Sequence, residues 1–540
     1  MVRYRSTATS LHGMVASSHP LSTLAGVKIL LKGGNAFDAA LATNAALSVV
    51  QPHICGLGGD AFFLLFDSKS GKVEFLNASG RASRNASISF YEDRGFKQIP
   101  SRGILAALQT PGCVDGWFKI YEKHCSLQLQ TLFADAIKYA EEGFPISHKL
   151  SEAITEGAST TFGKYKEWLK NYTKDGVAPR PGDVLKQPDL AWTLNQIASG
   201  GRKSFYEGPV AKRIALTMRN QGGLIDEDDL GSYEAEWGEP VSVKYRDYQI
   251  YETAPNSQAI TALLGFNILS HYELSGMKLD SFEHLRLLIE ASNTAYEYRK
   301  KYIADSDYVK ISTNELLSEA RGESDAKLLK EKLERSQLSE FLPHENAKDP
   351  GDTTYFCISD SENNCVSCIQ SNYMGFGSGI VPEGTGINLQ NRGSYFSLEK
   401  DHHNSLQPRK RTFHTLCASL TKKDDRPYLL FGSMGGDIQP QIHLQVISRI
   451  LDFDTDVQQA IEDPRWCRPG TIYENLQTIL VESRFVRRVI NQLRAIGYPI
   501  QTDHELSSAF GHAQAIKIDD KSGAMFGGAD PRGDGLALGV

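Results

Sequence analysis

One stretch of twelve residues constrains this chain more than any other, namely Asp349-Pro-Gly-Asp-Thr-Thr-Tyr-Phe-Cys-Ile-Ser-Asp360. The charged, helix-prone segment before it stops at Asp349-Pro-Gly351, because proline and glycine favour turns. The residues that follow, 353–360, have a pattern typical of a β-strand. Because a hydroxyl residue, Thr353, stands on this boundary, we predict that the chain is cut between Asp352 and Thr353.

A threonine at a new N-terminus would carry both a nucleophile and a base. Its hydroxyl is a weak nucleophile, and the α-amine, with an ordinary pKa of about 7.7–8.0, can activate it. The same hydroxyl could attack the Asp352 carbonyl in an acyl shift that hydrolysis completes. Acyl transfer also needs an oxyanion hole, for which Gly435 and Gly436 are candidates after a predicted strand. Threonine also simply favours β-structure, so the motif alone leaves both interpretations open.

Composition argues against several classes of protein. The formal net charge of -7 does not suit a nucleic-acid-binding protein, which usually presents a basic face. No apolar run reaches membrane-spanning length, and residues 1–13 contain no apolar signal segment. The length of 540 residues fits three or four domains or one large compact enzyme. We therefore expect neither nucleic acid nor a membrane as a partner.

The cysteines and histidines give no sign of a metal site. The eight cysteines are sparse, and we expect reduced thiols and a cytoplasmic location. Cys365-Val-Ser-Cys368 has CxxC spacing, but it alternates like a strand and has no second ligand pair. His402 and His403 lie in a polar stretch that we expect to be solvated. No metal and no organic cofactor are expected.

The hydrophobic pattern predicts that helices and strands both recur along the chain. Helices are expected over residues 21–32, 36–49, 260–269, 285–299, 443–451 and 486–496, and over most of 127–170. Strands are expected over 61–66, 72–77, 241–253, 353–360, 365–372, 416–420, 428–431, 514–518 and 523–526. The charged residues 318–344 are expected to form a mobile connection or a solvated helix. The glycine-rich residues 51–60 favour a tight turn, because their spacing matches neither common phosphate-binding motif.

Several motifs in order resemble the gamma-glutamyltransferase (glutathione hydrolase) family. They include Asp352-Thr-Thr-Tyr-Phe356, Gly375-Phe-Gly-Ser-Gly379 and Gly432-Ser-Met-Gly-Gly436, with further matches at 33–40, 56–60, 111–117, 384–387, 462–465 and 529–535. The resemblance covers essentially the whole chain. It implies an α+β N-terminal-nucleophile hydrolase fold, a four-layer αββα sandwich. It also implies a role in glutathione metabolism and a self-cleaved precursor, whose large (1–352) and small (353–540) subunits form one interleaved unit.

The resemblance also assigns roles to residues of the reaction. Thr353 is similar to the family's nucleophile, and Gly435 and Gly436 are similar to its oxyanion-hole pair. Ser371 falls where the family usually has a threonine whose hydroxyl assists the nucleophile. Arg81 resembles the arginine that binds the substrate α-carboxylate, a pairing that suits a guanidinium fork. The alternative for Arg81 is a surface ion pair.

At the substrate site the chain departs from the family pattern. Tyr373 replaces an asparagine, and Asn391-Arg-Gly-Ser-Tyr-Phe396 lacks the acidic pair that holds the substrate α-ammonium. His414 and Thr415 replace paired serines. Arg392, if it points inward, would repel an ammonium and favour a second carboxylate or an oxo-acid; the alternative is that it faces solvent or a structural partner. The predicted substrate residues are therefore Arg81, Tyr373, Arg392, His414 and Thr415.

Three hypotheses of function follow. The first is a self-processing threonine amidohydrolase that acts on a γ-glutamyl or similar small acidic amide through an acyl-enzyme, with hydrolysis favoured over transfer. The second is an enzyme of the same kind whose substrate is another amide, such as oxamate or an acyl side chain. The third is an unprocessed, inactive binding or scaffold protein. The two cleaved chains are expected to stay associated, and a homodimer of the processed unit is a further expectation.

Overall fold

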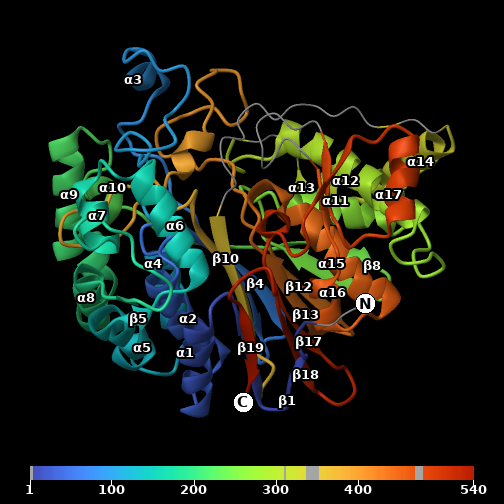
Figure 1. The fold of residues 1–540 in the computed structure, drawn as a ribbon, viewed down its shortest axis with the longest axis horizontal. Helices are drawn as coiled ribbons and strands as arrows, with labels where there is room; N and C mark the ends of the chain where they lie inside the picture. Colours follow the sequence, from blue (N-terminus) through green and yellow to red (C-terminus); the bar gives the residue numbers. More distant parts are fainter. Residues whose placement is uncertain (1–3, 309–311, 336–337, 339–351, 469–477) are drawn as a thin grey trace.

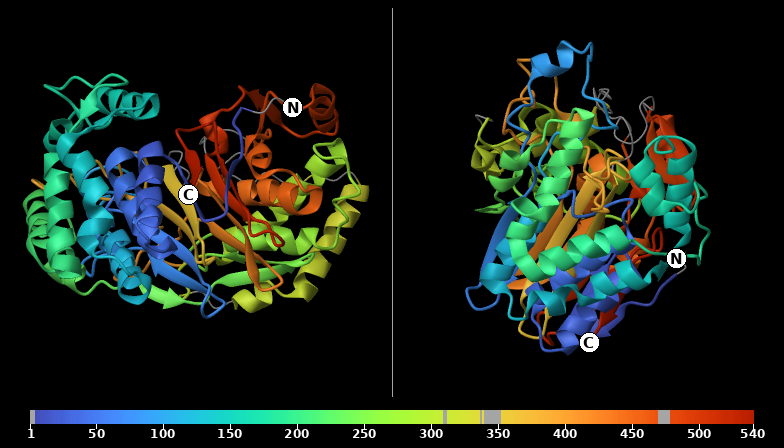
Figure 2. Two further views of the ribbon diagram at one scale, coloured as in Figure 1. Left: turned by 90° about the horizontal axis from the view of Figure 1, so that it is seen from below. Right: turned by 90° about the vertical axis from the view of Figure 1, so that its left-hand side faces the viewer.

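The structure is a computed structural model that describes all residues except 1–3, 309–311, 336–337, 339–351 and 469–477. Two seven-stranded sheets form its centre, and helices lie on the outer face of each sheet (Figures 1 and 2). This is the four-layer αββα sandwich that the resemblance implied.

The first sheet contains seven strands in the order β1 (Ala8–Ser10), β18 (Met525–Ala529), β17 (Ala513–Ile518), β13 (Arg426–Ser433), β12 (Ala418–Lys423), β9 (Tyr248–Glu252) and β8 (Val241–Tyr245). The order in the second sheet is β19 (Leu536–Gly539), β2 (Gly13–Ser17), β10 (Asp352–Asp360), β11 (Cys365–Tyr373), β3 (Asp60–Asp67), β4 (Lys72–Ala78) and β7 (Glu236–Gly238). Each sheet thus combines strands from before and after residue 352.

Five helices belong to the layer on the second sheet: α1 (Pro20–Leu31), α2 (Ala36–Val50), α4 (Cys113–His124), α5 (Leu129–Glu142) and α8 (Pro188–Tyr206). The first sheet is covered by α11 (Ile260–Leu269), α12 (Phe282–Tyr302), α15 (Gln439–Phe453) and α16 (Val457–Glu462). The other helices lie around these layers: α3 (Ile88–Glu92), α6 (His148–Ser159), α7 (Lys166–Tyr172), α9 (Pro209–Gln221), α10 (Glu227–Gly231), α13 (Thr313–Leu316), α14 (Glu319–Glu334) and α17 (Arg487–Ala495). Short strands pair as β5 (Phe144–Pro145) with β6 (Val184–Leu185), and as β14 (Trp466–Cys467), β15 (Ile479–Glu482) and β16 (Ile500–Asp503).

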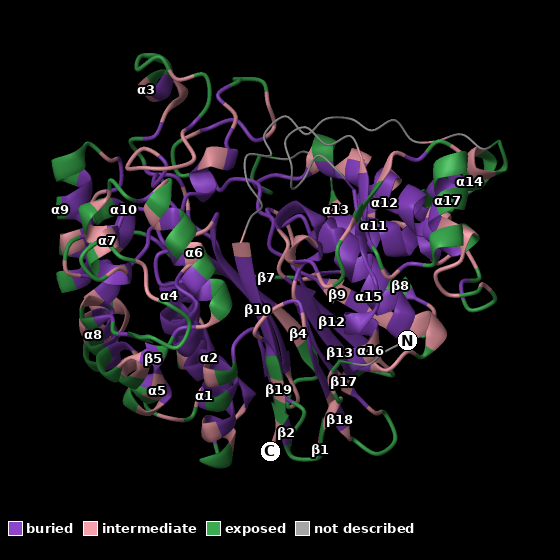
Figure 3. Cartoon of the chain, in the orientation of Figure 1, coloured by how far each residue is buried: buried purple, intermediate pink, exposed green. Residues whose placement is uncertain are grey.

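The predicted hairpin of β10 and β11 is confirmed and lies in the middle of the second sheet. Every residue of β11 is buried, as is every residue of β10 after Asp352, because both strands have neighbours on either side and layers on both faces (Figure 3). Residues such as Phe62, Tyr355 and Leu430 fill the space between the two sheets. The start of β10 is therefore held from all sides.

The glycine-rich segment 51–60 is a tight turn, as predicted. A side chain on Gly58 would place its Cβ 2.0 Å from the backbone oxygen of Asn388, and one on Gly59 would lie 2.4 Å from the oxygen of Ser371. Only glycine allows backbones to approach this closely. The turn thereby packs directly against the end of β11.

The charged segment 318–344 is helical over α14, as the helical alternative predicted. Ala326 and Leu329 are buried in the hydrophobic core that α14 shares with α11, while most of the helix is exposed. Ala326, Leu329 and the partly buried Leu333 are the apolar residues that join the helix to this core, so its sequence shows little apolar periodicity. The rest of that prediction falls on residues 336–337 and 339–344, which lie outside the described residues.

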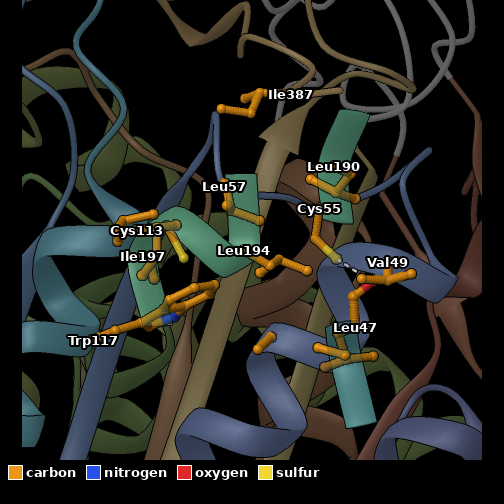
Figure 4. Close-up of a cluster of buried hydrophobic side chains, with 14 of the residues drawn as sticks. Leu47, Val49, Cys55, Leu57, Cys113, Trp117, Leu190, Leu194, Ile197 and Ile387 are labelled. Carbon is orange, nitrogen blue, oxygen red and sulfur yellow. Dashed lines mark hydrogen bonds between the residues drawn. The ribbon is translucent and has the colours of Figure 1, made fainter. Parts of the chain in front are cut away.

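The cysteines are free thiols, and most are buried. Cys55 and Cys113 lie in the hydrophobic cluster between α2, α4 and α8, beside Trp117 and Leu194 (Figure 4). Burial raises the pKa of Cys55 to about 12 and that of Cys113 well above its ordinary value. Because a thiolate is the reactive form, these thiols act as packing groups.

The C-terminal motif around Asp530 forms a buried ion-pair network. Its carboxylate accepts hydrogen bonds from Arg465 at 2.7 Å, from Arg532 at 3.0 Å and from the backbone N–H of Ala513 at 2.9 Å. Burial raises the pKa of Asp530, but the two guanidinium groups more than offset this, so the pKa is lowered. The motif joins β17 to the end of α16.

Asp530→Asn is expected to destabilise the protein by about 3–5 kcal/mol, because it leaves the buried Arg465 without its counter-charge and leaves Arg532 with Glu482 alone. Chemical unfolding followed by circular dichroism measures this. Asp520→Asn is the control, since Asp520 pairs with Lys423 at the surface and its replacement should leave the unfolding midpoint nearly unchanged. Equal unfolding midpoints for the two variants would contradict a stabilising role for this ion-pair network.

Candidate active site

Thr353 lies at the start of β10, opposite a β-bulge in β11. The register with β11 passes from Asp352 opposite Tyr373 to Thr354 opposite Gln370, so β11 has two residues, Ser371 and Asn372, opposite the single residue Thr353. It is 1% exposed, and its hydroxyl has no hydrogen-bond partner among the described residues. A bulge re-aims a side chain away from the regular pleat. The predicted nucleophile is thus a buried hydroxyl, without a hydrogen-bond partner among the described residues, beside the predicted cleavage bond.

The carbonyl of the Asp352–Thr353 peptide is held by Ser371. The Ser371 hydroxyl lies 2.6 Å from the Asp352 oxygen and accepts from the backbone N–H of Tyr373 at 2.6 Å. The Arg392 guanidinium donates to the same hydroxyl at 3.2 Å. Ser371 therefore connects the predicted cleavage point with Arg392.

Arg392 points inward and is fully buried, so it does not face solvent. Besides Ser371, its guanidinium donates to the Thr415 hydroxyl at 2.8 Å, and it lies over the ring of Tyr373 at 4.2 Å from the centroid. No carboxylate of the described residues lies within 4.0 Å of it. Burial lowers its pKa, with the neighbouring tyrosines and acids acting in the opposite direction. Arg392 is thus a buried cation without a direct counter-ion in the described part of the chain.

His414 lies next to this cluster and is bound to Asp60 at the start of β3. Its Nε2 is 3.0 Å from one oxygen of Asp60, whose other oxygen accepts from Gly80 N–H and from Gln390, both at 2.7 Å. Burial, followed by the charge of Arg392, lowers the pKa of His414 to about 4. His414 is therefore neutral near pH 7 and donates a hydrogen bond from Nε2–H to Asp60. Sequence reasoning missed Asp60, although this residue ends the Gly56–Asp60 motif.

Acid is expected to destabilise the protein from about pH 6.5 downward. His19, His53 and His512 share the property of His414, since burial lowers each pKa to about 4. At pH 7 both folded and unfolded chains are neutral at these positions. Below pH 6.5 the unfolded chain takes up protons that the folded chain cannot, so stability falls until about pH 4. Thermal midpoints at constant ionic strength should fall between pH 7 and 5; a flat profile would contradict these pKa directions.

Gly435 and Gly436 follow directly after β13 and precede α15. Their φ angles of 140° and 54° lie in the region that favours glycine, so other residues would be strained there. Gln258 binds the oxygens of both Gly436 and Thr415, at 3.0 and 2.8 Å. The glycine loop is thereby fixed to the strand-like segment that carries Thr415. No sequence pattern predicted that Gln258 would connect these two segments.

The position of Arg81 differs from that of the other predicted substrate residues. Its guanidinium donates to the Arg409 oxygen at 3.0 Å and forms an ion pair with Glu236 at 2.9 Å, with Asp305 and Asp307 each at 3.8 Å. Arg81 makes no contact with Ser371, Arg392 or Thr415. It belongs to a half-exposed ion-pair cluster, as the alternative interpretation had it.

No described helix is long and apolar enough to cross a membrane. Among the described residues, no group of three or more histidine, cysteine or acidic side chains could hold a metal ion.

Comparison with known proteins gives a consistent result. The family profile described as Gamma-glutamyltranspeptidase matches residues 22–540. The chain is 40% identical over 531 residues to the glutathione hydrolase-like YwrD proenzyme of Bacillus subtilis, covering 98% of each chain. It is 34% identical over 542 residues to the oxamate amidohydrolase proenzyme of Klebsiella pneumoniae, covering 99% of each. The solved structure of a cephalosporin acylase from Bacillus halodurans is similar, with a TM-score of 0.91, 35% identity and coverage of 100% of this chain and 98% of that one.

Proposed function

Because the chain belongs to the gamma-glutamyltranspeptidase family, we propose that it is made as a precursor that cuts itself between Asp352 and Thr353. Thr353 then becomes the N-terminal nucleophile of an amide hydrolase. The relatives named above as proenzymes support this processing. So does the burial of Thr353 and Arg392 in the uncut chain, because no substrate can reach them there.

The two chains produced by the cut stay together in this proposal. After cleavage, β10 of the small chain remains between β2 of the large chain and β11 of the small chain. The first sheet likewise combines strands of both chains. Separating them would expose the apolar layer between the sheets, at a cost of about 25 cal/mol for each Å² of apolar surface. The cytoplasmic location and a homodimer of the processed unit remain predictions.

Thr353 carries out hydrolysis in two steps. Its free α-amine takes the hydroxyl proton while the hydroxyl oxygen attacks the amide carbon, with Gly435 and Gly436 N–H groups as the proposed oxyanion donors. The proton passes to the leaving nitrogen, and the amine of the substrate departs. Water then attacks the acyl-enzyme, which releases the acid and restores the threonine. No metal and no cofactor take part in this proposal.

The proposed substrate is a small amide whose acyl part carries a carboxylate. The observation that carries this is Arg392, a buried guanidinium with no direct counter-ion, bound to Ser371 beside the nucleophile. A bidentate guanidinium suits a carboxylate. γ-Glutamyl amides fall in this class, and so does oxamate, on which the Klebsiella relative is named to act. Tyr373, His414 and Thr415 line the same region and are proposed to shape it.

The cleaved protein should appear without any added protease. Purified full-length chain incubated at neutral pH is expected to give two bands on a denaturing gel, with a rate that does not depend on protein concentration because the cut is intramolecular. A single full-length band after prolonged incubation would favour the inactive binding protein instead. A rate that rises with protein concentration would indicate a contaminating protease.

A further inference from the structure

We propose that Ser371 and Arg392 together stabilise the oxyanion that forms on the Asp352 carbonyl during self-cleavage, with Arg392 acting through Ser371. This rests on the proposed cut before Thr353. It concerns the step that makes the nucleophile, and it gives Arg392 a role before any substrate is bound.

The direction of the hydrogen bonds at Ser371 is fixed by chemistry. A serine hydroxyl has one proton to donate and two lone pairs with which to accept. The Tyr373 backbone N–H and the Arg392 guanidinium can only donate, and they occupy both lone pairs at 2.6 and 3.2 Å. The single hydroxyl proton must therefore point at the Asp352 carbonyl, 2.6 Å away. Ser371 thus already donates to the oxygen on which negative charge would develop.

The β-bulge brings the two reacting groups into this arrangement. Between two paired positions, Ser371 and Asn372 of β11 lie opposite Thr353 alone, so the regular ladder is interrupted where Ser371 meets the Asp352–Thr353 peptide. The Asp352 carbonyl accepts from a side-chain hydroxyl, and the Thr353 hydroxyl has no partner among the described residues. A hydroxyl without a hydrogen-bond partner among the described residues therefore lies next to a carbonyl that a hydrogen bond already polarises.

Arg392 strengthens the donor by its charge. It is buried, and no described carboxylate lies within ion-pair distance. Charges act strongly in such a water-excluded place, so a negative charge that develops near Arg392 is stabilised. Its contact with Thr415 and its position over Tyr373 hold the guanidinium in place without neutralising it. Arg392 is therefore a positioning residue whose effect reaches the carbonyl through Ser371.

The proposed step balances without any outside reagent except water. The Thr353 hydroxyl oxygen bonds to the Asp352 carbonyl carbon, and the carbonyl oxygen takes the negative charge while it accepts from Ser371. The bond between that carbon and the Thr353 nitrogen then breaks, and the nitrogen receives the proton that the hydroxyl has lost. Water hydrolyses the resulting ester, which gives the Asp352 carboxylate and a free threonine N-terminus.

The test follows self-cleavage of chains made by cell-free synthesis, with intact mass recorded over time. Ser371→Ala is expected to slow cleavage about 100-fold, the usual loss for one oxyanion donor. Arg392→Met is expected to slow it about tenfold, in line with a weaker effect through Ser371. The double variant should be no slower than Ser371→Ala, because Arg392 has nothing left to act on. Ser371→Thr, which keeps the hydroxyl, should restore cleavage. Arg219→Met, at an exposed arginine, is the control and should cleave normally.

The outcomes separate this inference from the proposed function. Normal cleavage of folded Arg392→Met, or effects of the two single variants that multiply in the double variant, would overturn the inference alone. A wild-type chain that never cleaves would overturn the proposed function together with it. Circular dichroism and thermal midpoints, compared with those of uncleaved Thr353→Ala, establish folding. Should Arg392→Met not fold, Arg392→Lys takes its place, with slower cleavage alone and no added effect on Ser371→Ala expected.

Discussion

Thr353→Ala is expected to remain a full-length chain and to lose amide hydrolysis, by about 10⁴-fold or more. The variant lacks the hydroxyl that attacks the Asp352 carbonyl, so the N-terminal amine never forms either. Removal of one buried hydroxyl that has no partner among the described residues should leave the fold intact. A denaturing gel and a hydrolysis assay on the same preparation measure both effects.

Two neighbouring variants serve as controls for this prediction. Thr353→Ser keeps a hydroxyl and should still cleave, more slowly. Thr354→Ala alters the next residue, whose hydroxyl is bonded to Ser18, and should cleave normally with a stability loss of about 1 kcal/mol. Cleavage of Thr353→Ala at the same bond would show that the nucleophile is another residue.

Glutaryl p-nitroanilide is expected to be hydrolysed with a kcat/KM at least about tenfold higher than that of γ-glutamyl p-nitroanilide. The two compounds differ only in the α-ammonium group. Arg392 is buried where that group would need a negative partner, and a like charge beside it costs more than the roughly 1.4 kcal/mol that corresponds to tenfold. Oxamate, measured by ammonia release, should also be a substrate, because it presents a carboxylate and no ammonium.

The comparison uses processed wild-type protein and follows p-nitroaniline release at one pH. Acetyl p-nitroanilide, which has no acyl carboxylate, is the matched control and should be the poorest of the three. A preference for the γ-glutamyl compound would show that Asp60, Asp437 or another group has replaced the missing acidic pair. Equal rates with the acetyl and glutaryl compounds would show that Arg392 binds no substrate carboxylate.

The hairpin of β10 and β11 was predictable because strand patterning and turn residues are local properties. The bulge opposite Thr353 was not, because it depends on how β11 pairs with β10. Ser371, Arg392 and Thr415 could be grouped only through family motifs, and their hydrogen bonds needed the structure. Each residue type is common in a strand or turn, so nothing local marked the three as neighbours.

Arg81 illustrates the opposite case. Its motif and residue type predicted a carboxylate-binding role, but its guanidinium pairs with Glu236 and approaches Asp305. These acids lie more than a hundred residues further along the chain, so no local pattern could show that they surround Arg81. The helix α14 was also hard to predict from the sequence, because only a few of its residues face the core and its apolar periodicity is therefore weak.

The position of the cut tests the central claim most directly. Intact-mass measurement of the two chains, combined with N-terminal sequencing of the smaller one, identifies the bond that is broken. The account predicts a small chain that begins with Thr353 and a large chain that ends with Asp352. A small chain that begins at any other residue would contradict it, because no other residue would then carry both the hydroxyl and the amine.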